Sequence, residues 1–416
     1  MECFFWRRHM KWNQEVAVVQ SMRGVAYRQR RRQGVRRIGI ALAAIGMGFG
    51  GSARASLNLY GVLDVGLNYR SVAGVDPSTG RAAGALALAS GNELTSRWGL
   101  IGLEDIGEGY KIAFKLESGF AADTGVANAS VPFPHDNGSL FDRGATIGVV
   151  APWGTVRLGR NWSSFFDGIS AGDATGYMNF GSLANATFQN SSNIKPSEGF
   201  PGIASGTNSA VNGGLMYTWV NKSIKYMLPD EFYGFSGGIT YGFGGTPGSF
   251  SNKSTLTANL NWTDGRLGFA SGYFDGKDPT GQTNDPWMRA YTIGVTYTWR
   301  ALKTGVNFAK FKNPTTGADQ NYYYVGAAYQ ATPAWRLTAD WLHLQDKQVS
   351  EAGADLYKIG AGYAFSKRTT LYVDVAYSNN KPKGMLGAGS NTSILASPAT
   401  IGHNQLAVGA GIRTLF

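Results

Sequence analysis

Side chains that could carry out catalysis are few in this sequence and lie far apart. After residue 55 the histidines are His135, His343 and His403, and none of them has the spacing of a zinc site or of an HExxH motif. The glycine-rich run at 46–50 resembles a dinucleotide-binding loop, but it follows no strand and lies in an apolar leader. No Gly-x-Ser-x-Gly elbow occupies a strand–helix junction. These patterns argue against an enzyme and predict neither a metal nor a cofactor.

The charged residues instead alternate with apolar ones over short stretches. Over residues 110–120, Phe114 and Leu116 alternate with Lys115 and Glu117. Successive side chains of a strand point to opposite faces, so this stretch puts its charge on one face. A Lys or Arg on the lipid face of a transmembrane barrel costs ~2–4 kcal/mol at the bilayer midplane. Lys115 and Glu117 are therefore predicted to point into a barrel whose apolar face meets lipid.

The last residues, 403–416, show the same alternation and end on an aromatic side chain. Val408, Ile412 and Phe416 share one face, and Arg413 lies on the other. A final strand of this kind can close a sheet by pairing with the first strand. We predict that Phe416 marks the closure of a barrel.

Sixteen such segments can be laid out, beginning near residues 56, 93, 110, 140, 154, 214, 233, 254, 265, 287, 302, 320, 334, 354, 368 and 403. Seven connections are tight turns, and eight are longer and polar: 72–92, 121–139, 161–213, 245–253, 275–286, 312–319, 346–353 and 379–402. Short and long connections that alternate around an even number of strands are typical of outer-membrane barrels. A secreted sandwich or β-helix would show a polar solvent face or a fixed repeat instead. The predicted fold is all-β, a 16-stranded antiparallel transmembrane β-barrel.

The net charge of +11 would suggest a nucleic-acid or anionic partner if it were spread over the chain. Residues 1–55 hold eleven Lys and Arg against two Glu, so +9 of this charge lies there and only +2 in the remainder. No nucleic-acid partner is predicted. The one cysteine, Cys3, also lies in this leader, so the body of the chain forms no disulfide.

Residues 1–55 have the three parts of a secretory signal. The basic run Arg28–Arg37 precedes the apolar run Ile38–Gly51, and small residues follow at Ala53 and Ala55. The apolar run is shorter than the ~20 residues of a membrane-spanning helix. We predict a signal peptide at 1–55, for which Met22 would be a more ordinary start, and a barrel domain at 56–416.

Several stretches carry a family resemblance when taken together: LNLYGVLDVGLNY (57–69), SRWGLIGLEDIGEGYKIAFKLESGF (96–120), LFDRGATIGVVAPWGTVRLGRN (140–161), NKSIKYMLPDEFYGFSGGITYGFG (221–244) and the terminal IRTLF. They resemble the trimeric general porins of Gram-negative outer membranes, of the β-proteobacterial type. The resemblance implies a homotrimer in outer-membrane lipid and lipopolysaccharide, inserted by the barrel-assembly machinery through its last strand. It also implies a water-filled channel for passive diffusion of ions and small hydrophilic solutes.

The resemblance further implies that the third extracellular loop folds into the barrel and narrows it. The long connection 161–213 fits this role, because loops of such length without regular structure are usually functional. In such porins basic side chains on the wall face acidic groups on the loop. The predicted constriction comprises Arg97, Arg143, Arg160, Lys115, Glu117, Asp167 and Asp173. A further arginine is common before the segment at 221–226, but Trp219 and Val220 stand there, so Lys222 is expected to supply part of that charge.

Tryptophans lie near many strand ends, among them Trp162, Trp219, Trp335 and Trp341. Aromatic belts at the two membrane interfaces would explain them. A sugar-specific channel would need a line of aromatic residues facing the interior. The alternatives to a diffusion channel are thus a substrate-specific channel, or a structural or adhesive barrel with a closed pore.

Cleavage is predicted between Ala55 and Ser56, because small residues end the leader there and a strand pattern begins at once. Amino-terminal sequencing of the protein from outer membranes should start at Ser56. A mature protein that keeps Ile38–Gly51 would contradict this assignment.

Overall fold

The computed structural model describes residues 55–127, 139–176, 178–183, 186–187, 218–229, 232–278, 281–315, 317–389 and 401–416. The expected leader up to residue 54 lies outside the described residues, so the signal peptide and its cleavage stay predictions. Among the described residues, no helix has the length and apolar character needed to cross a membrane.

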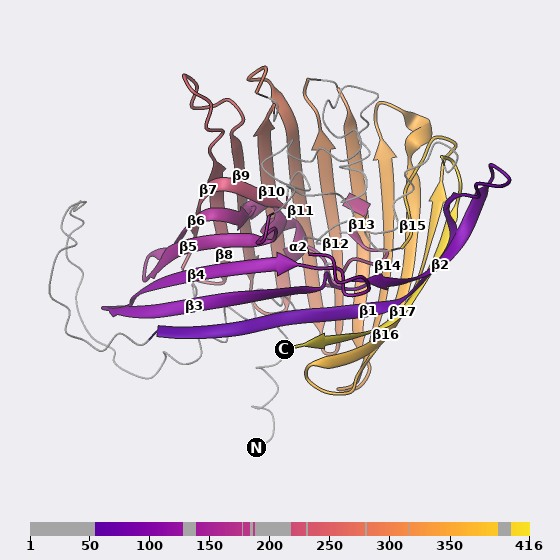
Figure 1. Ribbon diagram of the computed structural model, residues 1–416, viewed down its shortest axis with the longest axis horizontal. Coiled ribbons are helices and arrows are strands. Elements are labelled where there is room, and N and C mark those ends of the chain that lie inside the picture. The colour runs from indigo at the N-terminus through magenta and orange to yellow at the C-terminus, as the bar shows by residue number, and fades with distance from the viewer. Residues whose placement is uncertain are drawn as a thin grey trace. The chain divides into compact units, whose positions relative to one another are not determined.

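Within these residues, seventeen strand segments form one antiparallel sheet (Figure 1): β1 (Ala55–Val75), β2 (Ala82–Ser90), β3 (Arg97–Gly107), β4 (Tyr110–Gly119), β5 (Gly144–Ala151), β6 (Gly154–Trp162), β7 (Trp219–Met227), β8 (Phe235–Gly242), β9 (Thr255–Thr263), β10 (Leu267–Lys277), β11 (Pro286–Trp299), β12 (Leu302–Lys312), β13 (Asp319–Gln330), β14 (Trp335–Asp346), β15 (Ala354–Ala364), β16 (Thr369–Asn380) and β17 (Gln405–Leu415). From β3 to β17 each strand pairs with the next one in sequence, β1 pairs with both β2 and β3, and β17 pairs with β1. The described strands therefore make a closed barrel with sixteen positions around it. The predicted fold is confirmed.

One strand was not expected. β2 lies within the stretch 72–92, which the sequence predicted as a loop. β2 and β3 pair with successive parts of β1 along the same edge, so together they fill one position of the barrel. Residues 91–96 interrupt them, and the Asp64 carboxylate accepts hydrogen bonds there from the backbone N–H groups of Glu93 and Leu94, at 3.0 and 2.7 Å. The prediction failed because AAGALALAS has no polar face that would alternate with the apolar one.

The barrel closes where the last residue meets the first strand. The backbone N–H of Gly61 donates to the Phe416 carbonyl oxygen at 3.0 Å, and the Phe416 N–H donates to Gly61 at 3.1 Å. The phenyl ring occupies the space beside Gly61, where a Cβ atom would lie 2.2 Å from the ring. The pairing of β17 continues from Leu415 up to Ala407. Phe416 therefore has the closing position that the sequence predicted.

The two faces of β1 differ as the alternation predicted. Leu57 and Leu59 are 65% and 62% exposed on the outer face, whereas Asp64 and Asn68 on the inner face are 0% and 3% exposed. Ile412 in β17 continues the outer apolar surface. Apolar side chains thus lie outside and polar ones inside, which is the reverse of a soluble protein and is what a lipid environment requires.

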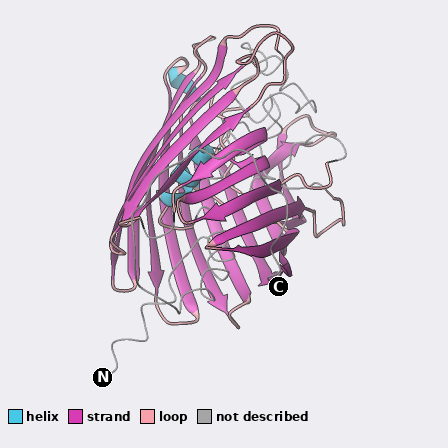
Figure 2. Cartoon of the chain, turned by 90° about the vertical axis from the view of Figure 1, so that its left-hand side faces the viewer, coloured by secondary structure: helices cyan, strands magenta, loops and turns pink. Residues whose placement is uncertain are grey.

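Loop 3, which joins β6 to β7, begins with the helix α2 (Ser164–Ala171) inside the ring of strands (Figure 2). Ser163 caps the helix, because its hydroxyl oxygen accepts the N–H of Phe166 at 3.0 Å. The Ser164 N–H donates to Thr257 of β9 at 2.9 Å, which ties the first turn to the inner wall. The close approach continues at Gly168, where a Cβ atom would lie 2.3 Å from the Ser271 carbonyl oxygen.

The apolar face of α2 packs against the inner wall and forms the core of the interior. Phe165 and Ile169 are fully buried. The Phe165 ring makes edge-to-face contacts with Phe274 of β10 and Phe311 of β12, at 6.2 and 5.8 Å between ring centres. The first part of loop 3, helix α2, is thus fixed against strands β9 to β12.

Replacing Gly61 by Ala should weaken closure, because its Cβ would overlap both the Phe416 ring and the Arg97 carbonyl oxygen, 2.7 Å away. Overpacking of this kind costs about 1–3 kcal/mol. The temperature at which heating unfolds the barrel, seen as a change in its migration on gels, should therefore fall. Gly74→Ala, in the same strand with no atom within 4 Å of its Cβ position, is the matched control. Equal effects from the two variants would contradict the described closure.

Candidate functional site

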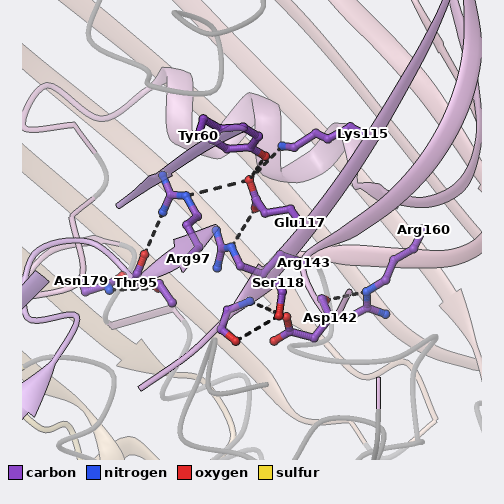
Figure 3. A network of polar contacts seen from close by, with 11 residues as sticks. Tyr60, Thr95, Arg97, Lys115, Glu117, Ser118, Asp142, Arg143, Arg160 and Asn179 are labelled. Atoms are coloured by element: carbon purple, nitrogen blue, oxygen red, sulfur yellow. Dashed lines mark hydrogen bonds and ion pairs between the residues drawn. The ribbon is translucent and has the colours of Figure 1, made fainter. Parts of the chain in front are cut away.

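A buried carboxylate organises the inner wall beside loop 3 (Figure 3). Glu117 of β4 is 0% exposed, and its Oε1 accepts from the Nε of Arg143 at 2.8 Å. The other carboxylate oxygen, Oε2, accepts from the Tyr60 hydroxyl at 2.6 Å. The Nζ of Lys115 lies 3.2 Å from this Oε2, and the Nε of Arg97 lies 4.0 Å from it. The structure thus brings together four of the predicted constriction residues.

This cluster has an excess of positive charge. A buried carboxylate is stable only when charge and hydrogen bonds compensate it, and Arg97, Lys115 and Arg143 surround Glu117 for that purpose. One carboxylate cannot neutralise three cations. In the contacts between described residues, one carboxylate thus faces three cations.

Arg160 lies next to this cluster and adds a fourth cation. Its Nε donates to the Asp142 backbone oxygen at 2.7 Å, and its guanidinium also donates to the side chain of Asn221 in β7. Asp142 is buried, and its carboxylate accepts the Gly119 N–H at 2.7 Å. The side chain of Arg160 is thereby fixed at the end of β6, where loop 3 begins.

Two tryptophans that the sequence assigned to interface belts lie inside instead. Trp162 and Trp219 face each other across β6 and β7, with ring centres 5.0 Å apart. The Cζ of Arg143 lies 5.1 Å from the Trp162 ring centre and 5.6 Å from that of Trp219. The Cζ of Arg160 lies 5.5 Å from the Trp219 ring centre. The belt prediction is wrong here because the indole faces stabilise guanidinium groups through cation–π contacts.

The first acidic residue of loop 3 is held by a lysine rather than by the arginines. The Asp167 Oδ2 lies 2.5 Å from the Nζ of Lys225, a nearly buried residue of β7. Lys222, which was expected to supply this charge, is exposed instead, with its Nζ near Gly245 of the β8–β9 loop. Lys225 therefore places a cation beside the start of loop 3.

Asp173, the second acidic residue of the loop, lies against the opposite wall. Its Oδ1 accepts from the hydroxyl of Tyr324 in β13 at 2.7 Å and from the Thr175 N–H at 2.6 Å. The Nζ of Lys303 in β12 donates to its backbone oxygen at 3.4 Å. The structure does not bring Asp173 together with Arg97, Arg143 or Arg160 in any of these contacts. It ties loop 3 to β12 and β13.

Sequence reasoning missed a second charged network farther around the interior. The Nζ of Lys358 lies 3.4 Å from Asp374 and 3.9 Å from Asp340. Arg413 pairs with Glu93 at 2.9 Å. All five side chains are buried. The inward positions of Asp340, Lys358, Asp374 and Arg413 in the strand alternation are the signal that could have identified them, whereas Glu93 lies between β2 and β3. Among the residues that the structure describes, no group of three or more His, Cys, Asp or Glu could hold a metal ion.

The fold and the charged interior define an outer-membrane channel, and comparison with known proteins gives the family. A model described as Gram-negative porin matches residues 40–383. Outer membrane porin protein 32 of Delftia acidovorans is 28% identical over 385 residues, covering 91% of this chain and 99% of that protein. The chain belongs to the Gram-negative porin family.

Two solved structures show the same fold. The anion-selective porin from Comamonas acidovorans superposes with a TM-score of 0.69 at 23% identity, covering 87% of this chain and all of that one. A trimer form of OmpT, an outer membrane protein of Vibrio cholerae, has a TM-score of 0.55 at 16% identity, covering 87% and 99%. This protein is an outer-membrane porin through which small hydrophilic solutes and ions diffuse passively. Its family indicates a channel rather than an enzyme.

Proposed function

We propose that the channel prefers anions weakly, and that its narrow point lies between the Glu117 cluster and loop 3. The observation that carries this proposal is the excess of cations on one wall. Counted over the described residues of this wall, the cations Arg97, Lys115, Arg143 and Arg160 outnumber the carboxylates of Glu117 and Asp142 by two. The fold relative from Comamonas acidovorans, named as anion-selective, supports the same direction.

The described part of loop 3 supports this placement because its two acidic residues, Asp167 and Asp173, contact other side chains. Asp167 is paired with Lys225, and Asp173 accepts the hydroxyl hydrogen of Tyr324. Neither carboxylate cancels the charge of the arginines directly. In a water-filled pore the Debye length is about 8 Å at physiological salt, so only charges within that reach of the path act on a passing ion. The preference should therefore be modest and should fade in concentrated salt.

We also propose a homotrimer that associates through the outer faces of the strands near both termini. A closed barrel has few free strand edges, so association must use apolar side chains on its outer surface. Leu57, Leu59 and Ile412 provide such a surface on β1 and β17. The trimer form of the related OmpT supports this assembly. Lipopolysaccharide around the barrel and recognition of β17 by the assembly machinery belong to the same proposal.

Neutralising two wall arginines should shift selectivity toward cations. A unit charge about 8 Å from the path contributes roughly 0.5 kcal/mol in water and less than half of that after screening. The double variant Arg97→Gln with Arg160→Gln should therefore lower the anion-to-cation permeability ratio about twofold. The reversal potential of the protein in a planar bilayer under a salt gradient measures this ratio.

Arg368→Gln is the control, because Arg368 lies exposed in the turn between β15 and β16. It should leave the reversal potential unchanged. A double variant with an unchanged reversal potential and conductance would show that the constriction lies elsewhere. Absence of any conductance in the wild-type protein would contradict the channel itself.

The trimer should persist in mild detergent. Unheated samples should migrate at about three times the mass of the mature chain, and heating should convert them to monomers, since association relies on surfaces rather than on covalent bonds. Light scattering in detergent gives an independent mass. A monomer under every mild condition would refute the assembly.

A further inference from the structure

One aromatic surface inside the barrel has no role in simple diffusion. The rings of Trp162 and Phe166 lie 4.4 Å apart where loop 3 leaves β6. Both side chains are partly exposed, whereas Trp219 next to them is 2% exposed. Trp162 also contacts Arg143, a member of the interior cluster. The exposed part of these rings therefore belongs to the interior of the channel.

Guanidinium groups border this surface in a fixed orientation. Arg143 is held at its Nε by Glu117, at 2.8 Å, and is stacked on both Trp162 and Trp219. Among the described residues, its two terminal nitrogens have no hydrogen-bond partner. The Cζ of Arg160 also lies 5.5 Å from the Trp219 ring centre. A planar set of donors thus stands beside an aromatic face, and little side-chain entropy remains to be lost on binding.

The carboxylate that follows these rings in the sequence is paired with a lysine. Asp167 follows Phe166 directly, but its Oδ2 lies 2.5 Å from the Nζ of Lys225. The same Nζ donates to the Trp162 backbone oxygen at 2.9 Å. Lys225 therefore compensates Asp167 at the point where the aromatic surface begins.

We propose that this surface is a binding subsite for planar aromatic carboxylates passing through the channel. The aromatic ring of the solute lies against the exposed part of the Trp162 side chain next to Phe166, and its carboxylate accepts hydrogen bonds from the terminal nitrogens of Arg143. The subsite adds a preferred class of anion to the anion preference proposed above, and it rests on that proposal. A saturated ring with the same charge lacks the π face for stacking, and a neutral sugar lacks the carboxylate.

The test compares benzoate with cyclohexanecarboxylate, which has the same charge and nearly the same size. Each acid is added to the wild-type trimer in a planar bilayer in KCl, and the concentration that halves the current is measured. Benzoate should act at a concentration roughly three- to tenfold lower, which is the worth of an aromatic stack. In Trp162→Leu this ratio should fall to about one when each current is normalised to that variant's own KCl current.

Trp335→Leu is the matched control, because Trp335 is 46% exposed on the outer face. It should keep the wild-type ratio. If Trp162→Leu does not give a heat-modifiable barrel, Phe166→Leu replaces it and should lower the ratio as well. Equal block by the two acids in the wild type, or a ratio that survives both substitutions, would overturn the subsite.

Three other outcomes separate this inference from the channel function. A KCl current without a preference for benzoate refutes the subsite and leaves the anion-preferring channel intact. Block by a neutral disaccharide at the concentration at which benzoate acts would make the surface a sugar platform and would also refute the carboxylate assignment. Absence of any KCl current would refute the channel and the subsite together.

Discussion

The structure depends on the rule that a backbone polar group facing lipid must find its hydrogen-bond partner within the protein. Strands satisfy this rule only when the sheet closes, and here closure joins β17 to β1. The two hydrogen bonds between Gly61 and Phe416 complete it at the end of the chain. Once the sheet is closed, each side chain of a strand faces either the lipid or the barrel interior, and the alternation along the strand decides which.

Closure also creates an interior that must be filled and compensated. Loop 3 fills part of it through the apolar face of α2, which packs on β9 to β12. The charges that lipid excludes gather inside, where they can be buried only as groups. Glu117 needs its cations and Lys358 needs Asp340 and Asp374 for the same reason. The cations gather on the inner wall because charged side chains are costly on the lipid face.

Much of the fold was predictable, because it follows from a period of two and from the cost of charge in lipid. Lys115 and Glu117 point inward as that reasoning requires. β2 was missed because its apolar residues do not alternate with polar ones. The partners of Asp167 and Asp173 were not predictable, since they depend on the path of a long loop across the interior. No local pattern specifies that path.

The inner contacts join residues that are very distant along the chain. The hydroxyl of Tyr372 donates to Asp64, 308 positions away, and Tyr324 meets Asp173 across 151 positions. Contacts of such separation form late in folding, because the entropy of closing long loops must be overcome first. These inner contacts should therefore form only when most of the strands are in place. An unfinished barrel would lack them, so the order of folding would delay the completion of the channel interior in the membrane.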